Sequence, residues 1–104
     1  MPTDRRSNAP RWKVDFAVEQ GCRLPGFIAR LSVAGAEIDA DSLPAVGSHV
    51  EVFAQLGSGG EVTVAGRVQW TTDTRFGVLF GPLGEREAGA IARALRQSER
   101  PRSP

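Results

Sequence analysis

Three arginines stand within eight residues near the start of the chain, in the stretch DRRSNAPR that runs from Asp4 to Arg11. A guanidinium group is always charged and presents its N–H donors as a planar fork, which matches the oxygens of phosphates and carboxylates. The stretch precedes any apolar period, so without a ligand Arg5, Arg6 and Arg11 would be a mobile basic arm for an acidic partner or a solvated tail.

Residues typical of catalysis are few and scattered. His49 and Cys22 are the only histidine and cysteine, so a histidine-pair metal site or a Cys/His nucleophile has too few parts. The glycine-rich GSGG lies between two apolar alternating segments and opens no helix, which indicates a hairpin turn rather than a phosphate loop. The carboxylates of AEIDADS lack the spacing of a calcium loop and indicate a solvated edge. We therefore expect no enzyme activity, no catalytic residue, no cofactor and no metal site.

Length and charge narrow the classes of protein further. A chain of 104 residues with 40% apolar and 24% charged residues is one globular domain. No apolar run is long enough for a membrane span or a secretory signal, so we expect a cytoplasmic protein without membrane insertion. A net charge of +1 argues against binding duplex nucleic acid through a broad basic surface.

Alternating apolar and polar residues predict about six short strands. A leader (1–10) and a disordered tail (98–104) flank the domain, which spans 11–97. The expected strands lie at 12–18, 26–33, 36–39, 49–56, 61–70 and 75–80. Within the second strand, Ile28, Arg30 and Ser32 share one face. Trp12 and Trp70 each end an apolar period, which favours packing at the core or rim over stacking on a planar ligand.

The period changes after the last strand. Residues 85–97 carry Ala88, Ile91, Ala92 and Leu95 at i, i+3, i+4 and i+7, which predicts one short amphipathic helix. The predicted fold class is all-β with one C-terminal helix, as a small six-stranded antiparallel barrel that hides its strand edges by closing.

The order of several segments resembles the PilZ domain, a family of bacterial receptors for cyclic di-GMP. The resemblance spans roughly residues 5 to 95 and rests on the arginine-rich leader, RLSVAGAEI, LPAVGSHVEVFAQL, and GRVQW followed by RFGVLF. It implies a six-stranded barrel with a C-terminal helix. It also implies a stand-alone receptor and adaptor that signals through an unidentified effector protein.

The family binds its ligand through an RxxxR element before the first strand and a [D/N]xSxxG element after the second. The resemblance therefore implies ligand-binding roles for these residues: Arg5, Arg6, Arg11, Arg30, Ser32 and Gly35. Ser32 and Gly35 stand at motif spacing, whereas Arg30 occupies the position of the family's Asp or Asn, and Arg6 precedes Arg11 by five residues instead of four. Arg30 has no acceptor atom for a guanine N–H group, although it can pair with a phosphate.

Two alternatives follow from these departures. The chain could be a PilZ-like domain that has lost its ligand and serves as a protein-interaction module, for example on type IV pilus or motility machinery. A barrel that binds single-stranded nucleic acid would need exposed aromatics along a basic groove, whereas the seven aromatics fall mostly in the period of the core. Titration with cyclic di-GMP separates the first alternative from a receptor.

Overall fold

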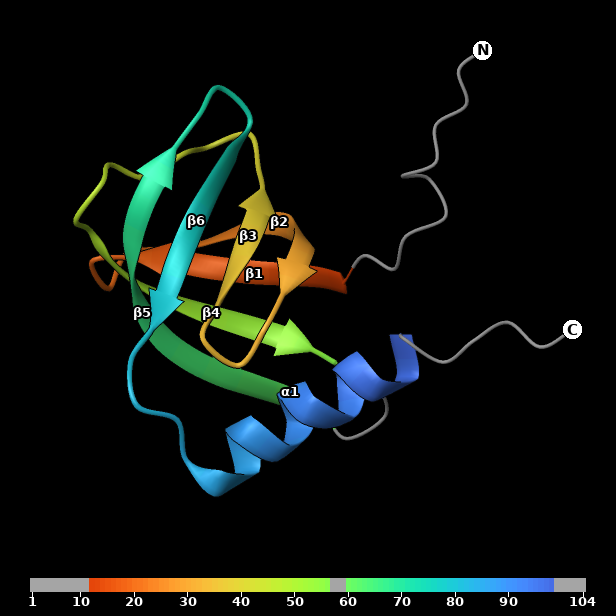
Figure 1. Ribbon diagram of the computed structural model, residues 1–104. Helices are drawn as coiled ribbons and strands as arrows, with labels where there is room; N and C mark the ends of the chain where they lie inside the picture. Colours follow the sequence, from red (N-terminus) through yellow and green to blue (C-terminus); the bar gives the residue numbers. More distant parts are fainter. Residues whose placement is uncertain (1–11, 57–59, 99–104) are drawn as a thin grey trace, which may run out of the picture.

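Six strands and one helix make up the part of the chain that the computed structural model describes, residues 12–56 and 60–98 (Figure 1). The elements are β1 (Trp12–Val18), β2 (Arg23–Leu31), β3 (Gly35–Asp39), β4 (His49–Gln55), β5 (Glu61–Thr71), β6 (Arg75–Phe80) and α1 (Glu85–Ser98). The predicted strands and helix are confirmed. Arg5, Arg6, Arg11 and the predicted tail from 99 onward lie outside the described residues, so what the sequence implies for them stays a prediction.

The strands close into a barrel in the order β1–β2–β3–β6–β5–β4, and β4 pairs back to β1. All six neighbouring pairs are antiparallel. Closure gives every strand a partner on both sides and removes the open edges that an isolated sheet would expose. The predicted six-stranded antiparallel barrel is therefore confirmed.

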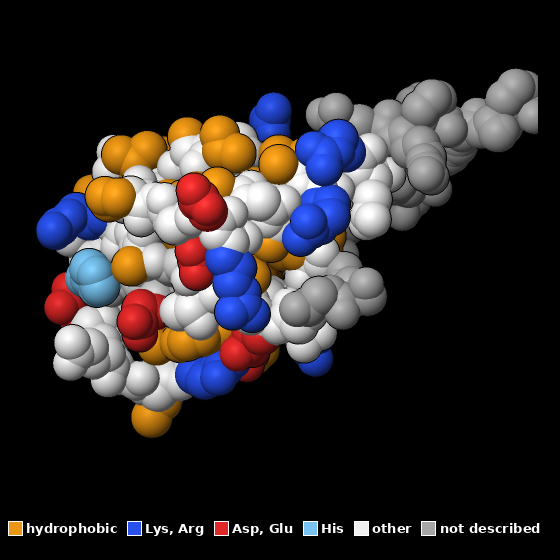
Figure 2. All heavy atoms as spheres, turned by 90° about the horizontal axis from the view of Figure 1, so that it is seen from below, with side chains coloured by type: hydrophobic (Ala, Val, Ile, Leu, Met, Phe, Trp, Pro, Cys, Tyr) orange, Lys and Arg blue, Asp and Glu red, His pale blue; other side chains and the backbone are white. Residues whose placement is uncertain are grey.

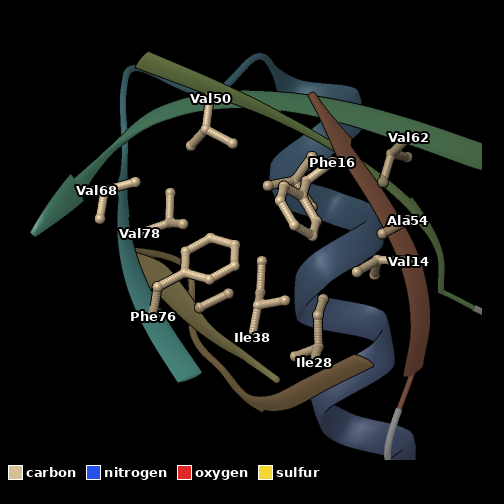
Figure 3. Close-up of a cluster of buried hydrophobic side chains, with 12 residues drawn as sticks. Val14, Phe16, Ile28, Ile38, Val50, Ala54, Val62, Val68, Phe76 and Val78 are labelled. Carbon is tan, nitrogen blue, oxygen red and sulfur yellow. The ribbon is translucent and has the colours of Figure 1, made fainter. Parts of the chain in front are cut away.

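Apolar side chains that alternate along the strands fill the interior of the barrel. Phe16 and Phe76, both fully buried, meet edge to face with ring centroids 4.9 Å apart. Side chains from all six strands point toward one another in Figure 3, among them Val14, Ile28, Ile38, Val50, Ala54, Val62, Val68 and Val78. No polar or charged residue is buried in the described part of the chain. Any polar or charged side chain of the described residues that could bind a ligand therefore lies on the outside of the barrel.

Strand β2 begins earlier than the sequence indicates. The second strand was expected from residue 26, but β2 starts at Arg23, and Pro25 lies inside the strand and pairs with β1. Strand β3 pairs with β2 only from Phe27 onward, so the missing N–H of Pro25 costs no bond to β3. The chain reverses instead at Glu19 and Gln20, whose φ angles are 50° and 63°.

A bulge in β2 changes the side to which its residues point. The register with β3 shifts between Ile28 and Arg30, so Ala29 is the extra residue. Ile28 is buried in the barrel, whereas Arg30 and Ser32 are exposed on the outer wall. The prediction that these three side chains share a face was therefore wrong for Ile28, because strict alternation does not continue through a bulge.

A second bulge has the same effect in β5. The register with β6 shifts between Val68 and Trp70. Val68 is buried at 1% exposure, whereas Trp70 is 38% exposed and lies on the outer wall. The alternating pattern of the sequence placed Trp70 on the same face as Val68, and this was wrong because the pattern does not continue through the bulge.

Helix α1 lies against the barrel beside β5 (Figure 1). Two glutamates in its first turn and an arginine in its last turn complement the helix dipole. Ile91 and Ala94 are its buried residues. The predicted stripe included Ile91 but missed Ala94, so the buried face is rotated slightly from the expected one. None of the described residues forms a helix with the length and apolar character needed to span a bilayer.

The face seen from below carries charges of both signs. Figure 2 shows Lys and Arg side chains interspersed with Asp and Glu and with apolar residues. The described part of this face therefore presents a mixed surface, in keeping with the chain's net charge of +1.

Candidate ligand-binding groove

A groove of about 460 Å³ lies on the outer wall of the barrel over the β3–β6 pair. Its volume falls within the range of about 300–1,000 Å³ that is typical of small-molecule sites. The side chains that give it chemical character are Arg30, Ser32, Glu37, Gln69, Trp70 and Leu79. The two bulged strands, β2 and β5, flank the β3–β6 pair, and each bulge turns polar or aromatic side chains toward the groove.

Ser32 shapes the turn that joins β2 to β3. Its Oγ accepts hydrogen bonds from the backbone N–H groups of Ala34 at 3.1 Å and Gly35 at 3.2 Å. Its backbone N–H donates to the carbonyl oxygen of Gly35 at 2.9 Å. Because a hydroxyl has two acceptor sites and one hydrogen, the turn uses both acceptor sites. Ser32 can therefore offer a ligand only its hydroxyl hydrogen. In this structure the hydroxyl donates weakly to the carbonyl oxygen of Gly35, with 3.4 Å between the two oxygens.

Gly35 is required by the packing of two strands. A Cβ atom at this position would lie 2.1 Å from the carbonyl oxygen of Val78 on β6. Any side chain would therefore push β3 away from β6, in the floor of the groove. The close approach is between two stretches of backbone, which gives this glycine a structural role whether or not a ligand also comes near.

Trp70 covers another glycine on the same wall. A Cβ at Gly77 would meet the indole Cε2 and Nε1 atoms at 2.4 Å, so the ring lies directly over the glycine. The part of the indole left exposed faces the groove. Sequence reasoning missed this aromatic wall, yet the glycine in the middle of RFGVLF was a usable signal, because a glycine inside a strand often marks a close approach.

An ion-pair network borders the groove. The Arg75 guanidinium donates from Nε to Asp39 Oδ1 at 2.5 Å and from Nη2 to Asp39 Oδ2 at 3.3 Å, and its Nη1 lies 3.4 Å from Glu37 Oε1. The hydrogen bond to Asp39 raises the pKa of Arg75 above its ordinary value, although partial burial opposes the shift. The predicted solvated edge is thus a paired network at Glu37 and Asp39. The described residues contain no cluster of three His, Cys, Asp or Glu side chains arranged to hold a metal ion.

Arg30 stands directly opposite Glu37 across the β2–β3 pair. Both side chains point outward and both line the groove. Among the described residues the Arg30 guanidinium makes no ion pair, which leaves its donors available to an incoming anion.

The start of β1 lies close to this region. Trp12, the first residue of β1, pairs with Ile28, two residues before Arg30 on the neighbouring strand. The groove therefore brings together three of the six residues implied by the resemblance, Arg30, Ser32 and Gly35. The three leader arginines fall outside the described residues.

The fold and its groove define a small closed β-barrel with a ligand-sized site on its outer wall. A family model for the PilZ domain matches residues 5–97, and the chain belongs to this family of cyclic di-GMP receptors, which are binding modules and not enzymes. Among solved structures, the chain resembles the crystal structure of the PilZ domain of CeSA from a cellulose-synthesizing bacterium, with a TM-score of 0.68 at 17% identity. That match covers 88% of this chain and 95% of the other, and shows a shared fold. No curated protein matches the chain significantly.

Proposed function

We propose that this chain is a cyclic di-GMP receptor that binds the nucleotide in the groove over the β3–β6 pair. The observation that supports the proposal is the convergence of Arg30, Ser32 and Gly35, the family's motif positions, with the exposed indole of Trp70 in one groove. The chain acts by binding alone, without a chemical step of its own.

The ligand's chemistry suits these groups. Cyclic di-GMP carries two phosphates and two guanines, and a guanidinium fork can pair with phosphate oxygens or with the O6 and N7 acceptors of guanine. Arg30 meets a phosphate, and Arg5, Arg6 and Arg11 of the family's arginine motif supply further guanidinium groups to the same ligand. The indole of Trp70 offers a stacking surface that is worth about 1–3 kcal/mol per base.

The receptor signals as an adaptor in the cytoplasm. Ligand binding changes the surface that an effector protein meets. The effector is bound through this altered surface.

Calorimetric titration of the full chain with cyclic di-GMP tests the proposal, with GTP and cyclic AMP as controls. We expect saturable heat with cyclic di-GMP only. At a ligand concentration 100 times the Kd, stabilisation of about 2.7 kcal/mol raises the Tm by about 10 °C or more. The absence of both heat and thermal shift at about 100 μM ligand, a concentration that saturates even a low-micromolar site, would contradict the receptor function.

A second candidate function is that of a protein-interaction module without a nucleotide ligand. It is favoured by the absence of an acceptor on Arg30 and by the use of both Ser32 acceptor sites within the turn. The same titration discriminates the two, because this module gives no response to cyclic di-GMP.

A further inference from the structure

A guanine in the groove needs an acceptor for its N1–H and 2-amino groups. These two donors lie side by side on one edge of the base, and an ionised carboxylate can accept from both at once. Arg30 contributes donors only. Glu37 is the only carboxylate among the described residues that line the groove.

Glu37 is placed where it can meet such a base. It stands opposite Arg30 in the register of β2 and β3, and residues in this relation have Cβ atoms about 4.5–5.5 Å apart. Its side chain is 31% exposed, so the carboxylate is accessible without being fully solvated. An acidic and a basic group therefore lie side by side on the groove wall, one suited to the base and the other to a phosphate.

Arg75 contacts one oxygen of this carboxylate. Its Nη1 holds Glu37 Oε1 at 3.4 Å, while Asp39 anchors the rest of the guanidinium through two hydrogen bonds. Glu37 Oε2 has no hydrogen-bond donor among the described residues. A carboxylate that is held at one oxygen and open at the other is prepared to accept from a ligand.

We propose that Glu37 is the guanine-specifying residue of this groove, that Arg75 positions it, and that Arg30 pairs with a phosphate of the same ligand. The inference rests on the proposed function and deepens it. It assigns the recognition of the base to β3, whereas the family's motif residue stands on β2.

The test compares cyclic di-GMP with its inosine analogue, which lacks the 2-amino groups but keeps N1–H. Calorimetry of the full chain should show wild type preferring cyclic di-GMP by about tenfold or more, the worth of a charge-assisted bond. Glu37→Gln replaces one acceptor by a donor, so cyclic di-GMP binding should weaken by about tenfold and the preference should largely disappear. Glu51→Gln on β4, outside the groove, makes the same change of charge and should alter neither.

Two further variants separate base recognition from other roles. Glu37→Asp keeps the charge but withdraws the carboxylate by one methylene, so the preference should fall, whereas a purely electrostatic role would leave it unchanged. Gln69→Ala removes the neutral acceptor of the groove and should preserve the preference. Circular dichroism and thermal unfolding of each variant establish that it is folded.

The outcomes distinguish the two proposals. A wild-type chain that does not bind cyclic di-GMP overturns the proposed function and this inference with it. If the wild type binds cyclic di-GMP but Glu37→Gln keeps the wild-type preference, the inference alone is overturned. The same holds if Glu37→Gln loses affinity equally for cyclic di-GMP and for the inosine analogue. Loss of the preference in Gln69→Ala, but not in Glu37→Gln, would assign the reading of the base to Gln69.

Discussion

The contact between Gly35 and β6 makes a sharp prediction about stability. In Gly35→Ala the new Cβ would start 2.1 Å from the carbonyl oxygen of Val78, and neither the Cβ nor the backbone oxygen can rotate away. Overpacking costs about 1–3 kcal/mol, and a clash between backbone-fixed atoms belongs at the upper end. We expect a loss of about 3 kcal/mol in the free energy of unfolding and a Tm lower by about 12 °C or more.

Gly89→Ala is the matched control. A Cβ at this helical position would meet no atom within 4 Å other than those of its chain neighbours and its own helix backbone, so the same chemical change should stabilise the protein by about 0.5–1 kcal/mol. Urea and thermal denaturation of both variants give the two free energies. If Gly35→Ala unfolded within about 0.5 kcal/mol of wild type, the ordinary range for a surface change, strand packing would not be the reason for this glycine. Its role would then have to be sought at the ligand.

Three further predictions concern the ligand. Arg11→Ala should abolish cyclic di-GMP binding in calorimetry while changing stability by no more than about 0.5 kcal/mol, and retained affinity would exclude the leader from the site. Trp70→Ala should weaken binding by about tenfold or more in calorimetry, whereas an unchanged affinity would show that the indole meets no base. Arg30→Asp places a carboxylate opposite Glu37 and near the phosphates of the ligand, so cyclic di-GMP binding should weaken, and most at low salt. If binding instead became about tenfold tighter, the missing acceptor at position 30 would be what limits affinity.

The strands and the helix could be predicted because their signals are local. An alternating pattern specifies a strand within a few residues, and apolar residues three and four apart specify a helix. The bulges at Ala29 and Gln69 could not be predicted this way, because an extra residue is defined only against the register of a neighbouring strand. For the same reason the start of β2 was placed three residues too late, since Pro25 is acceptable in a strand where β3 has not yet joined β2.

The candidate groove was only partly accessible from the sequence. The spacing of Ser32 and Gly35 pointed to it through the family resemblance, but their contacts show that the turn and the β3–β6 packing already employ both residues. Trp70 was assigned to packing at the core or rim, and its exposure to the groove was not foreseen because the bulge that turns it outward is not a local property. Glu37 was seen as one of several solvated carboxylates, since its position opposite Arg30 depends on the shifted register.

Closure of the barrel restricts how another protein can attach to it. Many peptide-binding domains capture an extended segment by strand addition, in which the segment's main chain bonds to an exposed sheet edge. Here each strand has two strand neighbours over most of its length, so in the described sheet that route is restricted to the first residues of β2 and β5, which have one strand neighbour each. Elsewhere a partner recognises side chains on the outer wall or on α1. Substitutions of those residues can change the choice of partner without altering the apolar interior, so recognition and folding can evolve separately.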